Sequence, residues 1–120
     1  MASTVELIAH RGASRERRQN TLPAFARALA LGVDGIELDT HITRDGVVVV
    51  HHDFIPIADP PEGVPAGVPI DAMTADDLAR FRFPDGSGIP TLREVIDLVG
   101  DRATLYVELK ARRIEREVVA

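Results

Sequence analysis

Short apolar runs of β-type residues alternate along this chain with stretches whose apolar residues recur at helical spacing. We expect strands at residues 5–9, 35–39, 47–50 and 104–109. We expect helices at residues 21–31, 74–79, 91–99 and 112–120. Because strands and helices alternate, the pattern predicts right-handed crossover connections, a parallel sheet and an α/β fold.

Capping and turn residues mark the limits of these elements. Thr21 and Thr91 stand where the N-caps of two helices belong, and Gly32 ends the first of them. Asp45-Gly46, just before the third strand, is a tight-turn signal. The proline- and glycine-rich segment after that strand has no periodicity, so we expect a loop there.

Each predicted strand carries ionisable or metal-binding side chains at or near its end. They are His10 and Arg11, Glu37 and Asp39, His52, and Glu108 and Lys110. Charge at the end of an apolar strand is costly unless it is paired or bound to a cation. Parallel strands present their carboxyl ends at one rim, and we therefore expect these side chains to form a single polar site.

Three of these side chains are carboxylates. Glu37 and Asp39 lie two residues apart on one strand, so both point to the same face. Each could simply pair with an arginine, which is the better explanation for a lone carboxylate. Together with Glu108 from a distant strand they favour an all-oxygen site for one divalent cation, Mg²⁺ or Ca²⁺.

The four histidines lie close to these strands. His10 and His52 end strands in matching positions, which suggests a general acid and a general base. We expect His51, on the opposite side of its strand from His52, to pack or face solvent. His41 is expected in a loop beyond the second strand, where its side chain could reach the mouth of the site. Asp53 either orients an imidazole or caps the following turn.

The basic residues near the site are suited to an anion. Arg11 offers two parallel donors to a phosphate, and Lys110 is the only lysine of the chain. Gly12 would let the backbone pass close to a ligand. Asn20, just before the first helix, could bind a ligand oxygen or serve as a cap.

Composition narrows the possible partners. The chain has 120 residues, 45% of them hydrophobic, and a net charge of −5, which argues against a nucleic-acid partner. With no cysteine it has no disulfide and no thiolate metal ligand. No apolar stretch approaches the ~20 residues of a membrane span, and no secretion signal is visible, so we expect a cytoplasmic protein.

Seven motifs, in order and with family-like separations, resemble those of the glycerophosphodiester phosphodiesterase family. They are His10-Arg11-Gly12-Ala13, Asn20-Thr21, Gly35-Ile36-Glu37-Leu38-Asp39, Thr43-Arg44-Asp45-Gly46-Val47, His52-Asp53, Ile89-Pro90-Thr91-Leu92 and Glu108-Leu109-Lys110. The resemblance implies a (β/α)₈ barrel that hydrolyses a small-molecule glycerophosphodiester to glycerol 3-phosphate and an alcohol. It implies acid–base roles for His10 and His52, phosphate binding by Arg11 and Lys110, and one divalent cation on Glu37, Asp39 and Glu108.

Two local departures accompany the resemblance. Arg18-Gln19 stands where the family usually has Pro-Glu, which removes an acid close to the phosphate. After His52 and Asp53 the family continues with a polar segment, whereas this chain has apolar residues at 54–57. The first change would alter the orientation of the ligand, and the second segment would shape the pocket for the alcohol.

Length is the largest departure, because a (β/α)₈ barrel takes about 250 residues. We interpret residues 1–120 as the N-terminal half of a barrel, with no second domain. Open sheet edges would then invite a homodimer or a C-terminal half that completes the barrel. Two alternatives are a non-catalytic half-barrel that binds a ligand or partner, and a lipid phosphodiesterase of the sphingomyelinase D type.

Overall fold

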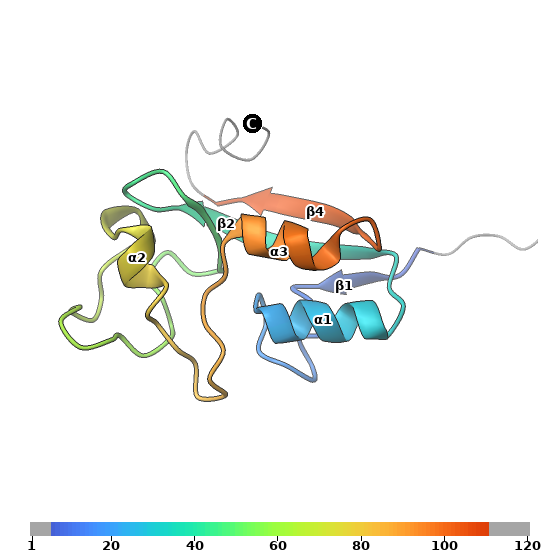
Figure 1. The fold of residues 1–120 in the computed structure, drawn as a ribbon, viewed down its shortest axis with the longest axis horizontal. Helices are drawn as coiled ribbons and strands as arrows, with labels where there is room; N and C mark the ends of the chain where they lie inside the picture. The colour runs from blue at the N-terminus through green and yellow to red at the C-terminus, as the bar shows by residue number, and fades with distance from the viewer. Residues whose placement is uncertain (1–5, 111–120) are drawn as a thin grey trace, which may run out of the picture.

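The structure is a computed structural model that describes residues 6–110. Its elements, in chain order, are β1 (Ile8–His10), α1 (Leu22–Ala30), β2 (Gly35–Ile42), β3 (Val48–Val50), the 3₁₀ helix η1 (Ile70–Ala72), α2 (Ala75–Leu78), α3 (Leu92–Val99) and β4 (Thr104–Leu109) (Figure 1). These elements confirm the strand and helix order expected up to residue 109. The helix expected at 112–120 lies outside the described residues.

The sheet is built around β2. Strands β1 and β4 both pair with β2 in parallel, with His10 opposite Glu37 and Glu108 opposite Asp39. Strand β3 pairs with the last part of β2 in the antiparallel sense, with Val50 opposite Thr40. The sheet is therefore mixed, with three parallel strands and one antiparallel strand.

The expectation that the strand at 47–50 would be parallel was wrong. A parallel connection needs a crossover of a dozen or more residues, and only a short turn separates β2 from β3. In this turn the amide of Gly46 donates to the carbonyl of Thr43 at 3.1 Å, and Gly46 has a φ of +86°. Asp45-Gly46 is therefore the turn of a hairpin.

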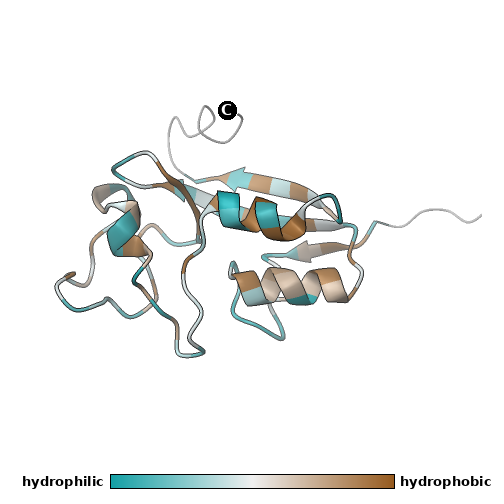
Figure 2. Cartoon of the chain, viewed as in Figure 1, coloured by the Kyte–Doolittle hydropathy of each residue, from teal (hydrophilic) through white to brown (hydrophobic). Residues whose placement is uncertain are grey.

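Helices α1 and α3 cover one face of the sheet and form the main core with it (Figure 1). Its buried residues are Phe25, Ala28, Ile36, Leu38, Val50, Leu92, Val95 and Val99. Since side chains alternate along a strand, the other face carries Glu37 and Asp39 of β2 and Glu108 of β4. Figure 2 shows the corresponding division on α3, where hydrophobic and hydrophilic bands lie side by side.

The helix limits follow the expected caps. The Thr21 hydroxyl accepts from the amide of Ala24, and Thr91 forms a capping box with Glu94. Gly32, with a φ of +78°, follows the C-cap of α1. These local signals were sufficient to place α1 and α3 from the sequence.

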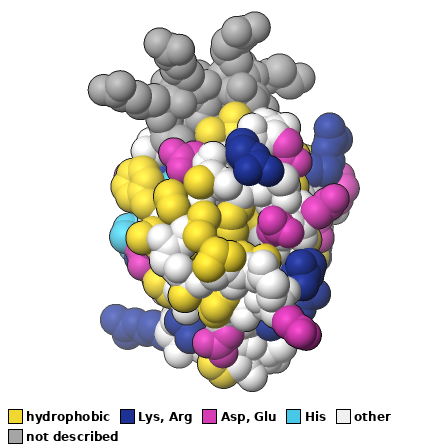
Figure 3. All heavy atoms as spheres, turned by 90° about the vertical axis from the view of Figure 1, so that its left-hand side faces the viewer, with side chains coloured by type: hydrophobic (Ala, Val, Ile, Leu, Met, Phe, Trp, Pro, Cys, Tyr) yellow, Lys and Arg dark blue, Asp and Glu magenta, His cyan; other side chains and the backbone are white. Residues whose placement is uncertain are grey.

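A second core cluster lies under the segment between β3 and α3. Its buried residues are Val49, Ala58, Ile70, Met73, Leu78, Phe81, Phe83 and Ile89. The loop expected after β3 is present and is anchored where the amide of Ile70 donates to the carbonyl of Phe54 at 2.8 Å. Hydrophobic side chains also gather on the surface at this end of the molecule (Figure 3). Phe54, Ile55 and Ile57 are among its exposed apolar residues.

Within residues 6–110, β1 and β4 each pair only with β2 and leave open sheet edges. Leu7 and Ile8 are 57% and 49% exposed, and the strand expected at residues 5–9 runs from Ile8 to His10. Tyr106 and Leu109 of β4 are also exposed. None of the helices in the described part of the chain is long and apolar enough to cross a membrane.

Candidate functional site

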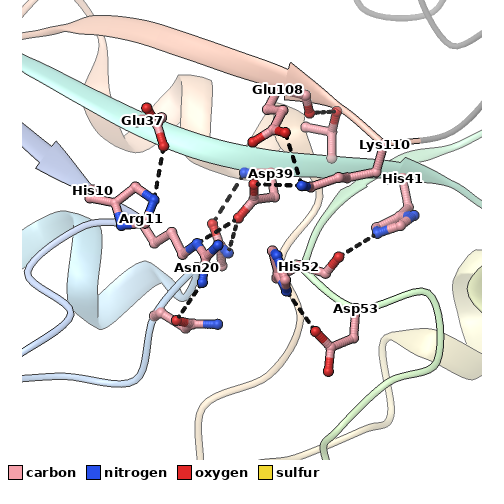
Figure 4. Close-up of polar contacts among 12 residues, drawn as sticks. His10, Arg11, Asn20, Glu37, Asp39, His41, His52, Asp53, Glu108 and Lys110 are labelled. Carbon is pink, nitrogen blue, oxygen red and sulfur yellow. Dashed lines mark hydrogen bonds and ion pairs between the residues drawn. The ribbon is translucent and has the colours of Figure 1, made fainter.

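Asp39 of β2 lies at the centre of the polar cluster and is 1% exposed (Figure 4). The side-chain amide of Asn20 donates to its Oδ2 at 2.9 Å, and the Asp39 amide donates back to Asn20 Oδ1 at 3.3 Å. Arg11 Nε lies 3.0 Å from Oδ2, and Lys110 Nζ lies 3.8 Å from Oδ1. Side chains from β1, β2 and the end of β4 therefore meet at one rim of the sheet.

The charge of Asp39 is set by two opposing effects. Burial alone would raise the pKa of its carboxyl group. The hydrogen bond from Asn20 and the positive charges of Arg11 and Lys110 outweigh burial, so the pKa of Asp39 lies below its ordinary value. Asp39 is thus ionised at neutral pH even though it is buried.

One oxygen of this carboxylate lacks a hydrogen bond. Asp39 Oδ1 is buried and accepts none, and Arg11 Nε, although close to Oδ2, is not aimed for one. A buried carboxylate oxygen without a donor is uncommon in folded proteins. Such an atom fits the role of a cation ligand, since a hard cation binds through carboxylate oxygens.

The loop between β1 and α1 holds Arg11 and Asn20 in unusual backbone conformations. Their φ angles are 59° and 56°, which cost a non-glycine residue about 1–2 kcal/mol each. The backbone amide of Asn20 donates to the backbone carbonyl of Arg11 at 2.9 Å, and this hydrogen bond closes the loop. The side chain of Asn20 holds the Asp39 carboxylate by a hydrogen bond. The N-cap of α1 is Thr21 and not Asn20.

Gly12 lies in the same loop with a φ of +82°. A Cβ atom at this position would meet the backbone and side chain of Ala24 at 2.9 Å. The glycine thus permits a close approach to α1, and the approach to a ligand expected from the sequence stays a prediction.

The two candidate acid–base histidines have carboxylate partners. His10 Nε2 lies 3.0 Å from Glu37 Oε1, and His52 Nδ1 lies 2.6 Å from Asp53 Oδ1 (Figure 4). Of the two roles considered for Asp53, the structure supports orienting an imidazole. When Nδ1 of His52 donates to Asp53, its Nε2 is left to exchange a proton.

The three candidate metal ligands share a face of the sheet but are not gathered into a cluster. Glu37 is paired with His10, and Lys110 Nζ donates to Glu108 Oε1 at 2.9 Å. The Glu108 carboxylate raises the pKa of Lys110. Among residues 6–110, no group of three potential ligands lies close enough to hold a metal ion.

His41 was wrongly expected in a loop. It belongs to β2, is 2% exposed, and donates from Nε2 to the carbonyl oxygen of His52 at 2.9 Å. Its ring packs edge-on against Phe54, with 4.9 Å between centroids. His41 lies two residues after Asp39, so in a strand that continues past Asp39 both side chains are on the same face. His41 thus supports the backbone that presents His52.

His51 is buried, which agrees with the packing role expected for it. Its Nε2 accepts from the amide of Ile57 at 3.3 Å, and its ring stacks on Phe83. Burial lowers the pKa of His51 to about 4. Because this pKa lies below that of an exposed histidine, His51 makes the free energy of unfolding depend on pH.

We expect the free energy of unfolding to fall between pH 6.5 and pH 4 by about 3 kcal/mol for His51. In this range the unfolded chain takes up a proton on His51, whereas the folded chain does not. The contribution is complete above pH 6.5 and lost as the pH approaches 4. Urea unfolding at several pH values measures it. The His51→Gln variant, which retains an acceptor for Ile57, should lose this part of the slope; an unchanged slope would refute the assignment.

The chain matches the glycerophosphoryl diester phosphodiesterase family over residues 10–119. A glycerophosphodiester phosphodiesterase of Caldanaerobacter subterraneus subsp. tengcongensis is 40% identical over 110 residues, which are 88% of this chain and 45% of that protein. Another from Bacillus altitudinis is 32% identical over 110 residues, 89% of this chain and 45% of that protein. The chain therefore spans about half the length of these curated relatives.

Solved structures agree. The glycerophosphodiester phosphodiesterase of Thermotoga maritima gives a TM-score of 0.81 at 33% identity, covering 98% of this chain and 50% of that one. A phosphodiesterase of Oleispira antarctica, solved with its product sn-glycerol-3-phosphate, gives 0.75 at 27% identity, covering 88% and 44%. These neighbours are (β/α)₈ barrels, so the predicted fold class is confirmed, with part of a barrel present in this chain.

Proposed function

Because the chain belongs to the glycerophosphodiester phosphodiesterase family, we propose that it carries the reacting groups for hydrolysis of glycerophosphodiesters to glycerol 3-phosphate and an alcohol. The observation that carries this proposal is the convergence of Arg11 and Lys110 on the buried, ionised Asp39. The proposed roles are acid and base for His10 and His52, phosphate binding for Arg11 and Lys110, and cation binding for Glu37, Asp39 and Glu108.

Arg11 and Lys110 would bind the phosphate oxygens of the diester. Their side chains are 22% and 21% exposed, so each remains reachable while it contacts Asp39. Positive groups fixed beside the phosphorus stabilise the charge that develops on its oxygens during hydrolysis. Asp39 keeps both cations in place and thus orients them before the substrate arrives.

The histidines would move the protons. One removes a proton from the attacking oxygen, which is a water molecule or the neighbouring hydroxyl of the glycerol, and the other protonates the leaving alkoxide. The contact with Asp53 fixes the His52 ring and favours the tautomer with a free Nε2. The contact of His10 with Glu37 places its ring over the same face of the sheet.

The proposed cation is Mg²⁺ or Ca²⁺. Its ligands would be Glu37, Asp39 and Glu108, and the donor-free Oδ1 of Asp39 supports this assignment. A bound divalent cation would neutralise negative charge on the phosphodiester. All three ligands are carboxylates on one sheet face, which suits a hard cation better than zinc.

Cation titration tests this part of the proposal. By calorimetry, the parent chain should bind one Mg²⁺ or Ca²⁺ ion, and Glu37→Gln should weaken the affinity by at least about tenfold, which is 1.4 kcal/mol. Asp97→Asn, an exposed change on α3, is the matched control and should leave the affinity unchanged. Equal affinity in the parent and Glu37→Gln would remove Glu37 from the ligand set.

We propose that a homodimer or a C-terminal half completes the barrel. The open edges of β1 and β4 and the coverage of about half of each relative support this. Measuring mass in solution alongside release of glycerol 3-phosphate from glycerophosphocholine tests it. Turnover by a dimer supports completion by a second copy. An inert monomer that binds glycerol 3-phosphate supports the non-catalytic alternative.

A further inference from the structure

The loop between β1 and α1 presents three exposed arginines, Arg15, Arg17 and Arg18, in a chain whose net charge is −5. Beside them lies an open cavity of about 560 Å³ between residues 14–19 and the loop at Pro84 and Asp85. The roles proposed above use none of these arginines. The cavity is therefore a basic surface that the phosphodiester reaction itself leaves unexplained.

The acidic groups of this cavity are already occupied. Glu16 binds Arg27 of α1, with 2.9 Å from Arg27 Nε to Glu16 Oε2. The carboxylate of Asp85 accepts from the amide of Ser87 at 2.9 Å and from its hydroxyl at 2.6 Å. Within the described part of the chain, no carboxylate lies within 4.0 Å of a charged nitrogen of the three loop arginines. No ion pair therefore fixes these guanidinium groups, although the charge of Arg18 helps to lower the pKa of the Asp85 carboxyl group.

The arginine loop is ordered by the backbone. The amide of Arg17 donates to the carbonyl of Ala13 at 2.9 Å, and the Thr21 hydroxyl donates to the carbonyl of Arg18 at 2.6 Å. The guanidinium of Arg18 lies over the ring of Phe83, 4.9 Å from its centre. The backbone of the loop is therefore held in one conformation, and the contact with Phe83 positions the guanidinium group of Arg18.

A side-chain contact joins this loop to the reaction site. Gln19, which lines the cavity, accepts from Arg11 Nη1 through its Oε1 at 3.1 Å. Gln19 thus lies between the cavity and Arg11, whose charge is paired with Asp39. A ligand whose phosphodiester contacts Arg11 could therefore extend past Gln19 toward the other arginines.

We propose that this cavity binds a phosphate monoester carried by the alcohol part of the substrate. Three guanidinium groups match a phosphate monoester of about −2 charge better than a carboxylate of −1, and arginine binds phosphate through paired donors. The preferred substrate class is then a glycerophosphodiester of a phosphorylated alcohol. The inference rests on the proposed function, because the phosphodiester must lie at Arg11.

Calorimetric binding of two probes tests the proposal. Glycerophosphoinositol 4-phosphate carries the second phosphate, whereas glycerophosphocholine carries a cation in its place. The parent chain should bind the first at least about tenfold more tightly at low salt, a difference of 1.4 kcal/mol. The preference should shrink as ionic strength rises, because the three arginines are exposed.

The test variant is Arg15→Gln/Arg17→Gln/Arg18→Gln. It should lose the preference while its affinity for glycerophosphocholine stays within about twofold, about 0.4 kcal/mol. The control Arg44→Gln/Arg93→Gln/Arg102→Gln removes the same charge from exposed positions elsewhere and should keep the preference. Circular dichroism confirms that both variants fold.

The possible failures separate the two proposals. If the parent binds glycerophosphocholine but shows no preference for glycerophosphoinositol 4-phosphate, only the phosphate-monoester cavity is overturned. The same holds if both triple variants lose the preference equally. A parent that binds neither probe overturns the proposed function and this inference with it. If the test variant keeps the probe preference but loses binding to phosphatidylserine vesicles, the loop serves a membrane surface and the inference is wrong.

Discussion

Replacing His52 or His10 with alanine should lower turnover of glycerophosphocholine by about 10²–10⁴-fold, the usual contribution of a positioned acid or base. Each variant removes one end of the proton path and leaves the other histidine in place. The side chains of His10 and His52 are 62% and 37% exposed, so neither loss opens a cavity in the core. Divalent-cation affinity should change little, because neither histidine is a proposed ligand.

Release of glycerol 3-phosphate, measured across pH in the preparation that shows turnover, checks this result. Asp53→Asn, which keeps the His52 contact but removes the charge, should lower turnover less than His52→Ala. Turnover by both alanine variants at the parental rate would refute the acid–base assignment.

Replacing Asp39 with alanine should lower the free energy of unfolding by about 1–3 kcal/mol, because it leaves Arg11 without its buried counter-charge and Lys110 with Glu108 alone. It also removes the partner of the Asn20 amide, which is itself buried. Asp39→Asn keeps the shape of the side chain, so its effect should lie between that of alanine and the parent.

Urea unfolding at pH 7 measures these losses. Glu108→Ala on β4 is the control, because its side chain is 51% exposed and its ion pair with Lys110 is worth less than about 1 kcal/mol. A loss of less than about 1 kcal/mol for Asp39→Ala would mean that the cluster contributes nothing beyond a surface ion pair.

Local signals predicted much of the fold. The N-caps Thr21 and Thr91 and the glycine at Gly32 act within one turn of their helices, so the sequence was enough to place α1 and α3. The predicted direction of β3 was wrong, because strand–helix alternation indicates a parallel strand whereas the short turn at Asp45-Gly46 makes β3 antiparallel to β2. Chain connectivity decides strand direction, and a short turn permits only the antiparallel sense.

The candidate site was partly predictable for a similar reason. Strand periodicity placed Glu37 and Asp39 on one face, and strand pairing brought Glu108 opposite Asp39. The sequence could not reveal that Asn20 clamps Asp39, because that contact depends on the left-handed backbone at Asn20 and joins residues 19 positions apart. Nor could it show which ion pairs the carboxylates form, since these depend on side-chain orientation.

Binding of sn-glycerol 3-phosphate in the presence of Mg²⁺, followed by the amide NMR shifts of the labelled chain, tests the central claim most directly. The account predicts saturable shifts concentrated at Arg11, Asn20, Asp39 and Lys110, the residues around one rim of the sheet. Shifts centred instead on the exposed side of α3, or no saturable shifts at all, would contradict a phosphate site at the end of β2.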